Sequence, residues 1–384
     1  MKYEEIVHRC FRCGYCKFTE DYHDFNCPTY RKFRFETFSP GGRMWLIRAW
    51  LNNEIRTSER LQQILFSCAT CANCAEHCVF TFKDDLVNIF IAAREKLVDE
   101  QIIPPAVRDY FKNIHTSGNP YKEPEAERGK WAEGTGIKPF DAQEYLFYVG
   151  CVGSYDERAK KIARSVGNLL LRSGLSFGIL GEREHCDGNE VKALGEAGLF
   201  QHLAEQNITQ FKEIGAKKII TLDPHAFNAF KKDYKELGAN FEVSHYSQVL
   251  AHLLQSKRIP LASYKARVTF HDPCYLGRHN GVYDPPRQIL KSIPGLELVE
   301  MHQNRANALC CGGGGGNFFT DILGGGEDSP SRIRVRQALD TGAQIIAVSC
   351  PQCAKMLEDA LKAENLTERL DVLDVSEIMN RALA

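Results

Sequence analysis

The sequence lacks any apolar run long enough to cross a membrane. A spanning helix needs roughly 18 consecutive apolar residues, whereas apolar runs such as 145–149 and 345–348 have the length of strands. We therefore expect no direct membrane span, and association with a membrane through a partner stays open. The first twelve residues also lack the apolar segment of a secretory leader, so we expect a cytoplasmic protein in a reducing compartment.

Basic charge and a need for disulfide staples are missing as well. The formal net charge is −1 and no basic run occurs, which leaves no electrostatic footprint for a nucleic-acid backbone and argues against such a partner. With 384 residues and 43% apolar content, the chain can build two or three domains with cores of their own. Cysteine is abundant, at fifteen positions, and these thiols must do something other than hold a small fold together.

The N-terminal cysteines form two closely spaced runs. The first is CxxCxxC at Cys10, Cys13 and Cys16, followed by Cys27, and the second is CxxCxxCxxxC at Cys68, Cys71, Cys74 and Cys78. In bacterial ferredoxins three cysteines of a run hold one 4Fe-4S cluster and the fourth crosses to the other cluster. The runs therefore predict two cubane clusters with these ligand sets: Cys10, Cys13, Cys16 and Cys78 for cluster A; Cys68, Cys71, Cys74 and Cys27 for cluster B.

Two zinc sites with four cysteines each are the alternative for these runs. Zinc needs only two separated CxxC pairs, which would leave Cys13 or Cys71 redundant, so iron is preferred. Between and after the runs, apolar residues at helical spacing predict a linking helix within 42–64 and a second helix over 84–99. We expect an α+β, mainly helical ferredoxin-like domain over 1–115 and a linker over 116–140, which is rich in Gly, Pro, Glu and Lys.

The remainder of the chain repeats itself. Strand-like runs over 144–150 and 267–270 each lead to a cysteine, at Cys151 and Cys274. Cysteine-glycine turns follow at Cys186 and at Cys310-Cys311, and second strands over 217–222 and 343–349 run into similar turns. Strands that alternate with helices predict parallel sheets, so we expect two α/β units over 141–262 and 263–384. Ligands in such sheets bind at the carboxyl ends of the strands, where both cysteine sets fall.

These residues resemble the cysteine-rich CCG domain, which occurs twice in the catalytic subunits of heterodisulfide reductases and their relatives. In that family a complete unit supplies five cysteines to a noncubane 4Fe-4S cluster that binds and reduces a disulfide. The second unit has the complete set: Cys274, Cys310, Cys311, Cys350 and Cys353. The first unit has Asp187, Asp223 and Ala226 where the motif has cysteines. A mixed zinc site could use Cys151, Cys186, Asp223 and His225, but unmetallated remnants are preferred.

Further residues are expected around the noncubane cluster. Gly312, Gly313 and Gly314 would let the backbone approach the cluster and donate N–H groups to its sulfurs. A phosphate-binding loop is the alternative, but no GK[ST] follows the glycines. Arg278 could hold an anionic substrate or be a solvated loop charge. Candidate proton donors, each of which could instead be structural, are His271, His279 and His225.

The resemblance implies an oxidoreductase that works within an anaerobic electron-transfer complex. Electrons would pass through two cubane clusters to the noncubane cluster, which reduces or forms a disulfide-like bond of a thiol substrate. The alternative is a relay without a substrate of its own, between a flavin-containing partner and another enzyme, such as benzoyl-CoA reductase, or a quinone pool. No G-x-G-x-x-G motif follows a strand. The partner is therefore expected to carry the flavin and to be heterodisulfide reductase A-like or electron-transfer flavoprotein-like.

Overall fold

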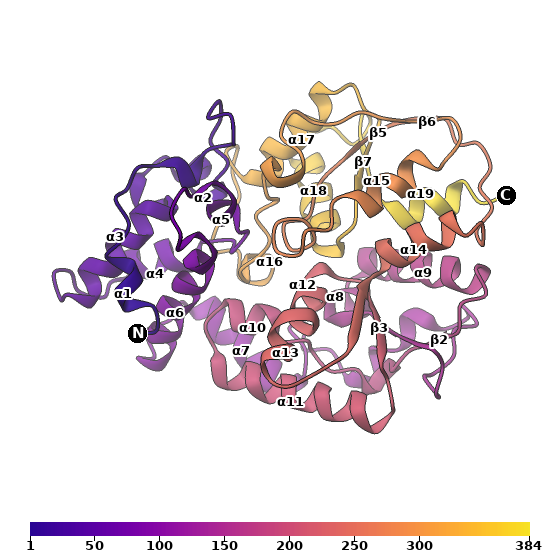
Figure 1. Cartoon of the computed structure of the whole chain (residues 1–384), viewed down its shortest axis with the longest axis horizontal. Coiled ribbons are helices and arrows are strands. Elements are labelled where there is room, and N and C mark those ends of the chain that lie inside the picture. The colour runs from indigo at the N-terminus through magenta and orange to yellow at the C-terminus, as the bar shows by residue number, and fades with distance from the viewer.

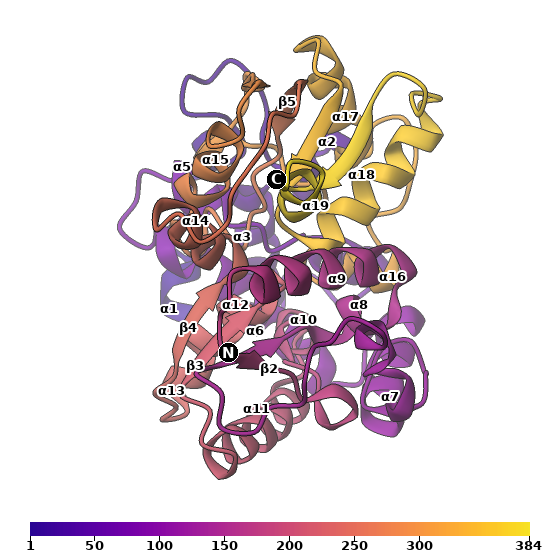
Figure 2. The same cartoon turned by 90° about the vertical axis from the view of Figure 1, so that its right-hand side faces the viewer.

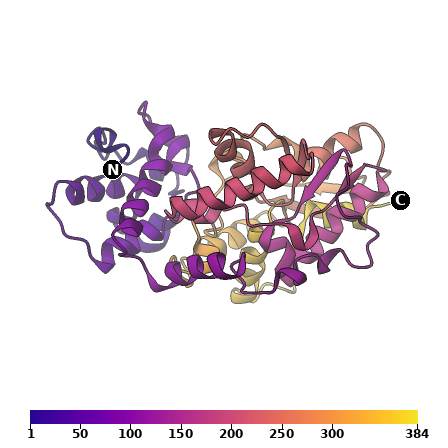
Figure 3. The ribbon, with the colours of Figure 1, turned by 90° about the horizontal axis from the view of Figure 1, so that it is seen from below.

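A computed structural model describes all residues, 1–384, and shows three parts. The N-terminal part lies at one end of the molecule and the two α/β units form the other end (Figure 1). Seen from below, the chain termini lie at opposite sides of an elongated molecule (Figure 3). All three parts contribute residues to the cysteine-rich region where they meet.

The N-terminal part is helical, as predicted. Its elements are connected by the loops that carry the cysteine runs. Its helices are α1 (Glu4–Val7), α2 (Pro28–Phe33), α3 (Pro40–Leu51), α4 (Glu59–Phe66), α5 (Asn73–His77), α6 (Leu86–Asp99) and α7 (Pro105–Ser117). The predicted helix over 84–99 is confirmed as α6, whose buried face includes Ile89, Phe90 and Leu97.

The linking helix predicted within 42–64 is confirmed only in part, because α3 ends before Ile55 and a second helix follows in this segment. Helix α3 ends at Leu51, and Asn53 has a φ of 58°, a left-handed conformation that stops an α-helix. A new N-terminus follows, since the side chain of Ser58 accepts a hydrogen bond from the backbone N–H of Leu61 and caps α4. The apolar spacing that predicted one helix therefore continues past the end of α3.

The segment predicted as a linker, 116–140, is packed against the first α/β unit. Beyond the end of α7 at Ser117, it carries only short 3-10 turns, at Glu125–Glu127 and Lys130–Ala132. The side chains of Arg128 and Trp131 are each only 2% exposed. Trp131 packs edge-on against Phe147 of the first sheet, with ring centroids 6.0 Å apart. The segment is therefore part of the folded body, and the exact boundaries of the units stay predictions.

The two α/β units have the same topology, which confirms the predicted repeat. Each has one four-stranded sheet in which all strands are parallel, with the orders β2-β1-β3-β4 and β6-β5-β7-β8. The strands of the first unit are β1 (Tyr145–Tyr148), β2 (Phe177–Gly178), β3 (Lys218–Thr221) and β4 (Glu242–His245). Those of the second are β5 (Ala266–Phe270), β6 (Leu296–Leu298), β7 (Ile345–Val348) and β8 (Asp371–Asp374).

Helices cover the sheets as expected for α/β units. The first unit contains α8 (Gly150–Tyr155), α9 (Glu157–Arg172), α10 (Asn189–Ala193), α11 (Ala197–Glu213), α12 (Pro224–Asn228), α13 (Tyr234–Glu236) and α14 (Tyr246–Gln255). The second contains α15 (Asp284–Lys291), α16 (Asn317–Thr320), α17 (Pro330–Asp340), α18 (Pro351–Ala363) and α19 (Val375–Arg381).

The two units pack on each other through two reciprocal helix contacts. Helix α14 of the first unit contacts α15 of the second, and α9 of the first contacts α19 of the second (Figure 2). Arg158 on α9 binds Glu377 on α19 at 2.6 Å, and one hydrophobic core runs through both units. The cysteine motifs of the two units lie near this shared interface, since Asp223 and His225 of the first unit have ligand atoms within 4.8 Å of Cys350 of the second.

The buried side chain of Arg94 joins all three parts. On α6, its guanidinium donates to the carbonyl oxygens of Leu65, Phe66 and Cys68 in the N-terminal part. It also reaches Ala193 O at 2.6 Å in the first unit and Gly315 O at 3.2 Å in the second. Burial lowers the pKa of Arg94 to about 10, so the group stays charged at neutral pH and fixes the three parts relative to one another.

Candidate metal centres

Six thiols from two parts of the chain meet in one buried group. Cys71 of the N-terminal part packs with the five cysteines of the second unit, together with Ala69 and Tyr275. None of these six cysteines is more than 8% exposed. We call this group the thiol core; its cysteines are Cys71, Cys274, Cys310, Cys311, Cys350 and Cys353.

The strand ends and a helix start position these thiols. Cys274 follows β5, and Cys350 follows β7. Cys350 is also the N-cap of α18, where its Sγ accepts a hydrogen bond from the backbone N–H of Cys353 at 3.4 Å. Parallel neighbours β5 and β7 place both turns at the same edge of the sheet.

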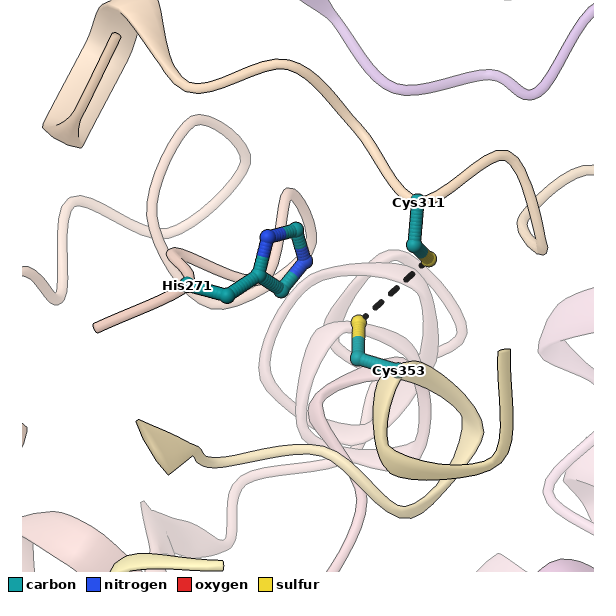
Figure 4. A group of neighbouring side chains, drawn as sticks. All are labelled: His271, Cys311 and Cys353. Atoms are coloured by element: carbon teal, nitrogen blue, oxygen red, sulfur yellow. Dashed lines mark hydrogen bonds between the residues drawn. The ribbon is translucent and has the colours of Figure 1, made fainter. Parts of the chain in front are cut away.

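The distances within the thiol core are short. Cys310 Sγ lies 3.7 Å from Cys274 Sγ, and Cys311 Sγ lies 3.5 Å from Cys353 Sγ. His271, at the end of β5, has a ligand atom within 4.8 Å of both thiols of the second pair, and its ring points toward them (Figure 4). Thiolates are preferred ligands of iron, so this donor set fits an iron–sulfur cluster.

Ionised thiols in the thiol core need positive charge to balance them. Hydrogen bonds from Cys310 and Cys353 lower the pKa of Cys311 well below its usual value. Conversely, hydrogen bonds with neighbouring thiols, followed by burial, raise the pKa of Cys71 and of Cys353 well above the usual value. Not all of these thiols can ionise together in a dry core unless cations compensate them, and iron ions would supply that compensation.

The glycine loop has two roles of different kinds. The backbone N–H of Gly312 donates to Cys310 Sγ at 3.3 Å, whereas donation to the sulfurs of a cluster stays a prediction. Further along, a Cβ on Gly314 would lie 2.6 Å from Ala69 O, and one on Gly315 would lie 2.3 Å from Cys68 O. Part of the glycine run is thus explained by close contact with the N-terminal part, which sequence reasoning did not foresee.

The three candidate histidines occupy different environments. His271 accepts a hydrogen bond at Nδ1 from Arg334 Nε at 3.1 Å, and its Nε2 is buried without a partner. His279 instead pairs Nε2 with Thr70 O at 2.7 Å and stacks on Tyr275 with ring centroids 4.2 Å apart. Burial lowers the pKa of His279 to about 3. His271 is brought to the thiols, whereas His279 ties the second unit to the N-terminal part.

His225 of the first unit reaches the second unit's cysteine motif. Its Nδ1 lies 2.6 Å from Asp223 Oδ1, and its ring packs on Tyr275 at 4.3 Å. Asp223, His225 and Cys350 offer ligand atoms within 4.8 Å of one another. Burial opposes protonation of His225, but the charge of Asp223 and a hydrogen bond with it prevail and raise its pKa well above the usual value.

The contacts of Arg278 are not those of a solvated loop charge, and a role toward an anionic substrate stays a prediction. The guanidinium donates to Cys71 O at 2.7 Å, to Ala306 O at 3.1 Å and to Ala308 O at 2.6 Å. Nε and Nη1 bind the three carbonyls and hold the loop of Cys71 against the segment before Cys310, whereas Nη2 is buried without a partner. A sequence offers no local signal for this role, and the same is true of Arg334 beside His271.

The four cysteines predicted for cluster A share one cavity, and several of the other N-terminal cysteines lie nearby. A small cavity is lined by Cys10, Cys13, Cys16 and Cys78, with Met44 and Phe82 among its apolar residues. Burial, together with the charges of nearby Cys68, Cys71, Cys16 and Cys27, raises the pKa of Cys74 well above its usual value. Thiol donors with apolar surroundings fit cubane iron–sulfur clusters; the assignment of individual ligands stays a prediction.

The first unit's remaining groups line a cavity of their own. Cys151, Cys186, Asp187, Glu190, Asp223 and His225 surround it. Burial raises the pKa of Asp187 to about 6. The thiol that lies within 4.8 Å of both Asp223 and His225 is Cys350 of the second unit. The expected zinc set of Cys151, Cys186, Asp223 and His225 is therefore less compact than the set that includes Cys350.

The fold and thiol sets define a class, an iron–sulfur protein with a dicluster module and two cysteine-rich α/β units. Comparison with known families agrees. Residues 6–81 match the 4Fe-4S dicluster domain, and residues 145–231 and 268–358 match the cysteine-rich CCG domain. The chain belongs to the family of iron–sulfur oxidoreductases that includes the D-type subunits of heterodisulfide reductases, because it is similar to such proteins over nearly its whole length, as follows.

Relatives of known name fall into two groups. The chain is 31% identical to the D-type subunit of the dihydromethanophenazine:CoB–CoM heterodisulfide reductase of Methanosarcina barkeri, over 97% of this chain and 93% of that protein. It is 38% identical to the probable iron–sulfur-binding oxidoreductase FadF of Bacillus subtilis, and 34% identical to the EtfAB:quinone oxidoreductase of Syntrophomonas wolfei. Each of these two alignments covers 84% of this chain, but the chain spans only 47% of each of these longer relatives.

One solved structure has a similar fold. A hypothetical protein from Helicobacter pylori superposes with a TM-score of 0.59 over 100% of this chain and 72% of that one, at 12% identity. This likeness shows a shared fold.

A third relative, 33% identical, is named a probable membrane-anchored ferredoxin of Chromohalobacter salexigens. In the structure of this chain, no helix has both the length and the apolar character that a membrane crossing needs.

Proposed function

We propose that this protein accepts electrons and converts a disulfide within an electron-transfer complex, with three iron–sulfur centres. The observation that carries the proposal is the thiol core, in which Cys71 lies against the complete five-cysteine set of the second unit. A noncubane cluster held there would supply one-electron chemistry and an iron site for a substrate sulfur. The cubane clusters would be held by the two N-terminal sets.

The side chains around the core have roles that follow from their contacts. Cys274, Cys310, Cys311, Cys350 and Cys353 would hold the cluster. Gly312 directs its N–H toward Cys310 Sγ, and Arg278 fixes the loop of Cys71. His271 stands within 4.8 Å of Cys311 and Cys353 with Nε2 free of hydrogen bonds. This position suits a proton donor to a departing thiolate; Arg334 orients the ring from the other side.

Partners are proposed from the relatives' names and from the absence of a nucleotide fingerprint. One relative is named a quinone oxidoreductase acting on EtfAB, and another is named as part of a heterodisulfide reductase. Both names are consistent with a flavin-containing partner that is electron-transfer flavoprotein-like or heterodisulfide reductase A-like. The complex would work in the cytoplasm, with any membrane attachment through a partner.

A relay without its own substrate is the second candidate. It is favoured by the burial of the five cysteines of the second unit, none of which is more than 7% exposed. Electrons can reach such a site by tunnelling, whereas a disulfide must open a path to it. The partner on the far side would then be another enzyme, such as a benzoyl-CoA reductase, or a quinone pool.

Anaerobic iron, sulfide and zinc quantitation combined with EPR separates these candidates. Wild type and Cys311→Ala are compared with and without an added thiol or disulfide. About twelve irons per chain, and a thiol-sensitive paramagnetic signal that the substitution abolishes, are expected for the reductase. About eight irons, with spectra that respond neither to thiols nor to the substitution, would leave a two-cubane relay.

A further inference from the structure

Two cysteines lie outside the three predicted ligand sets, and they are neighbours. Cys151 lies at the start of α8, and Cys186 lies in the turn before α10. Both are 6% exposed, and both line the same small cavity. The complete motif would use these positions for a cluster, but the chain has Asp187, Asp223 and Ala226 in place of the other three cysteines. The pair therefore remains as a free dithiol.

One member of the pair has a fixed cation beside it. Arg128 Nη2 donates to Cys151 Sγ at 3.3 Å, and Arg128 itself pairs with Glu184 at 3.4 Å. Glu184 in turn accepts backbone N–H groups of Val149 and Gly150 at 3.0 and 2.8 Å. The guanidinium is thus held in place by a buried carboxylate that has its own partners. The hydrogen bond with Cys186, and then the charge of Arg128, outweigh burial and lower the pKa of Cys151, whereas that of Cys186 is raised by the same bond and by burial.

The pair is connected to the surface. A cavity of about 540 Å³ is bordered by the exposed residues His115 and His202, and Cys186 forms part of its wall. Cys186 also lines the inner cavity, which contains Cys151 and extends to Gln352 between two cysteines of the second unit. The outer cavity has the size of a small-molecule site. Because Cys186 borders both cavities and Cys151 only the inner one, a small molecule that enters from the surface would reach Cys186 first.

We propose that Cys151 and Cys186 form a redox-active dithiol that reduces a small organic disulfide by thiol–disulfide exchange. The starting pair carries one proton and one negative charge: a Cys151 thiolate beside Arg128, hydrogen-bonded by the Cys186 thiol. This activity is independent of the proposed cluster function, because it uses neither the thiol core nor the N-terminal cysteines.

The exchange balances without another reductant. Cys186 passes its proton to Cys151 and attacks as the thiolate, so that its sulfur bonds to one sulfur of the disulfide and the S–S bond of the disulfide breaks. The first product leaves as a thiol with the proton that Cys151 received, which restores the Cys151 thiolate. The Cys151 thiolate then attacks the Cys186 sulfur and expels the second product as a thiolate. The cysteine pair loses two electrons and becomes a disulfide, and the substrate gains these two electrons. An external dithiol returns the pair to the starting state.

The test uses the intact, iron-loaded protein and dithiodipyridine, a small aromatic disulfide whose thiopyridone product is measured by absorbance. We expect about two equivalents of thiopyridone per chain, and a linked peptide pair that contains Cys151 and Cys186 in the mass spectrum. Cys151→Ser should release about one equivalent and keep the other half of the reagent on Cys186. Cys186→Ser should react far more slowly, because Cys151 is behind the missing thiol.

Other outcomes would overturn the proposal. Both thiols of the wild type staying unmodified would show that the pair is inert. A loss of iron in step with thiopyridone release would show that cluster ligands, not this pair, react. About one zinc per chain that is lost in Cys186→Ser would show a metal site instead. Iron content and EPR, recorded on the same samples, keep a failure of this proposal apart from a failure of the cluster assignment.

Discussion

The side chains of Cys71 and Cys310 pack together in the thiol core, although one belongs to the N-terminal part and the other to the second α/β unit. Cys71 is a predicted ligand of cubane cluster B, and Cys310 is a predicted ligand of the noncubane cluster. A contact between ligands of different centres would place the centres close together. Electron transfer between them would then need no mobile carrier, and the interface that holds the two loops becomes part of the function.

Arg278 is expected to control how firmly this interface holds iron. Arg278→Lys keeps the charge but cannot reach the carbonyls of Cys71, Ala306 and Ala308 together, because an ammonium lacks the planar fork of a guanidinium. We expect iron to be released to a chelator about 10- to 100-fold more readily, as for other residues that position metal ligands. The measurement is the anaerobic rate of iron transfer to a coloured chelator.

A matched control for this change is Arg305→Lys. Arg305 lies on the same segment as Ala306 and Ala308, but its side chain is 45% exposed and pairs with Asp284 at the surface. The control should release iron at the wild-type rate. Equal rates for all three proteins would show that Arg278 does not support the metal centres.

The sequence predicted the parts of the structure whose determinants are local. Cysteine spacing and short apolar runs are local, and the runs before Cys151 and Cys274 are strands as predicted. Arg94, Arg278 and Arg334 could not be assigned, because their acceptors come from distant segments that only the fold brings together. The break at Asn53 was missed because apolar spacing on both sides kept the same period. The packed linker was missed because composition alone indicated flexibility.

The glycine loop should be intolerant of a methyl group at Gly315. This residue has a φ of 63°, and a Cβ would lie 2.3 Å from Cys68 O. Gly315→Ala should therefore destabilise the protein by about 2–4 kcal/mol, from backbone strain and the forced separation of the loop from the N-terminal part. Gly325→Ala is the control, because nothing lies within 4 Å of its added Cβ. Anaerobic thermal unfolding measures both; equal unfolding temperatures would contradict the packing argument.

Arg94 is expected to couple the unfolding of the three parts. Arg94→Lys leaves several of the carbonyls of Leu65, Ala193 and Gly315 without a donor in a dry interface. A loss of about 3–5 kcal/mol is expected for breaking such a buried network. Calorimetry should then show the N-terminal part unfolding before the α/β units. Arg60→Lys, on the exposed face of α4, should keep a single transition. A single transition in both variants would show that other contacts suffice for the coupling.

The buried carboxyl of Asp374 predicts how stability depends on pH. Burial at the end of β8 raises its pKa from 3.8 to about 7, although Ser376 and Tyr246 donate hydrogen bonds to it. Between about pH 4 and pH 7 the folded protein therefore binds a proton that the unfolded chain has lost. The stabilisation from this proton is complete below the pKa of the unfolded chain and is lost as pH rises toward 7. The loss in the free energy of unfolding is up to about 4 kcal/mol, at 1.4 kcal/mol per pKa unit.

Asp374→Asn removes the titrating group and should flatten this part of the stability curve. Asp371→Asn changes a half-exposed carboxylate at the other end of the same strand, and it should keep the wild-type slope. Denaturant unfolding of iron-loaded protein at several pH values measures the slopes. Other groups titrate in the same pH range. The deciding quantity is therefore the difference between wild type and Asp374→Asn in the slope of the unfolding free energy against pH. If that difference is zero, Asp374 is ionised in the folded protein. Its hydrogen bonds with Tyr246 and Ser376 would then outweigh the cost of burying the charge.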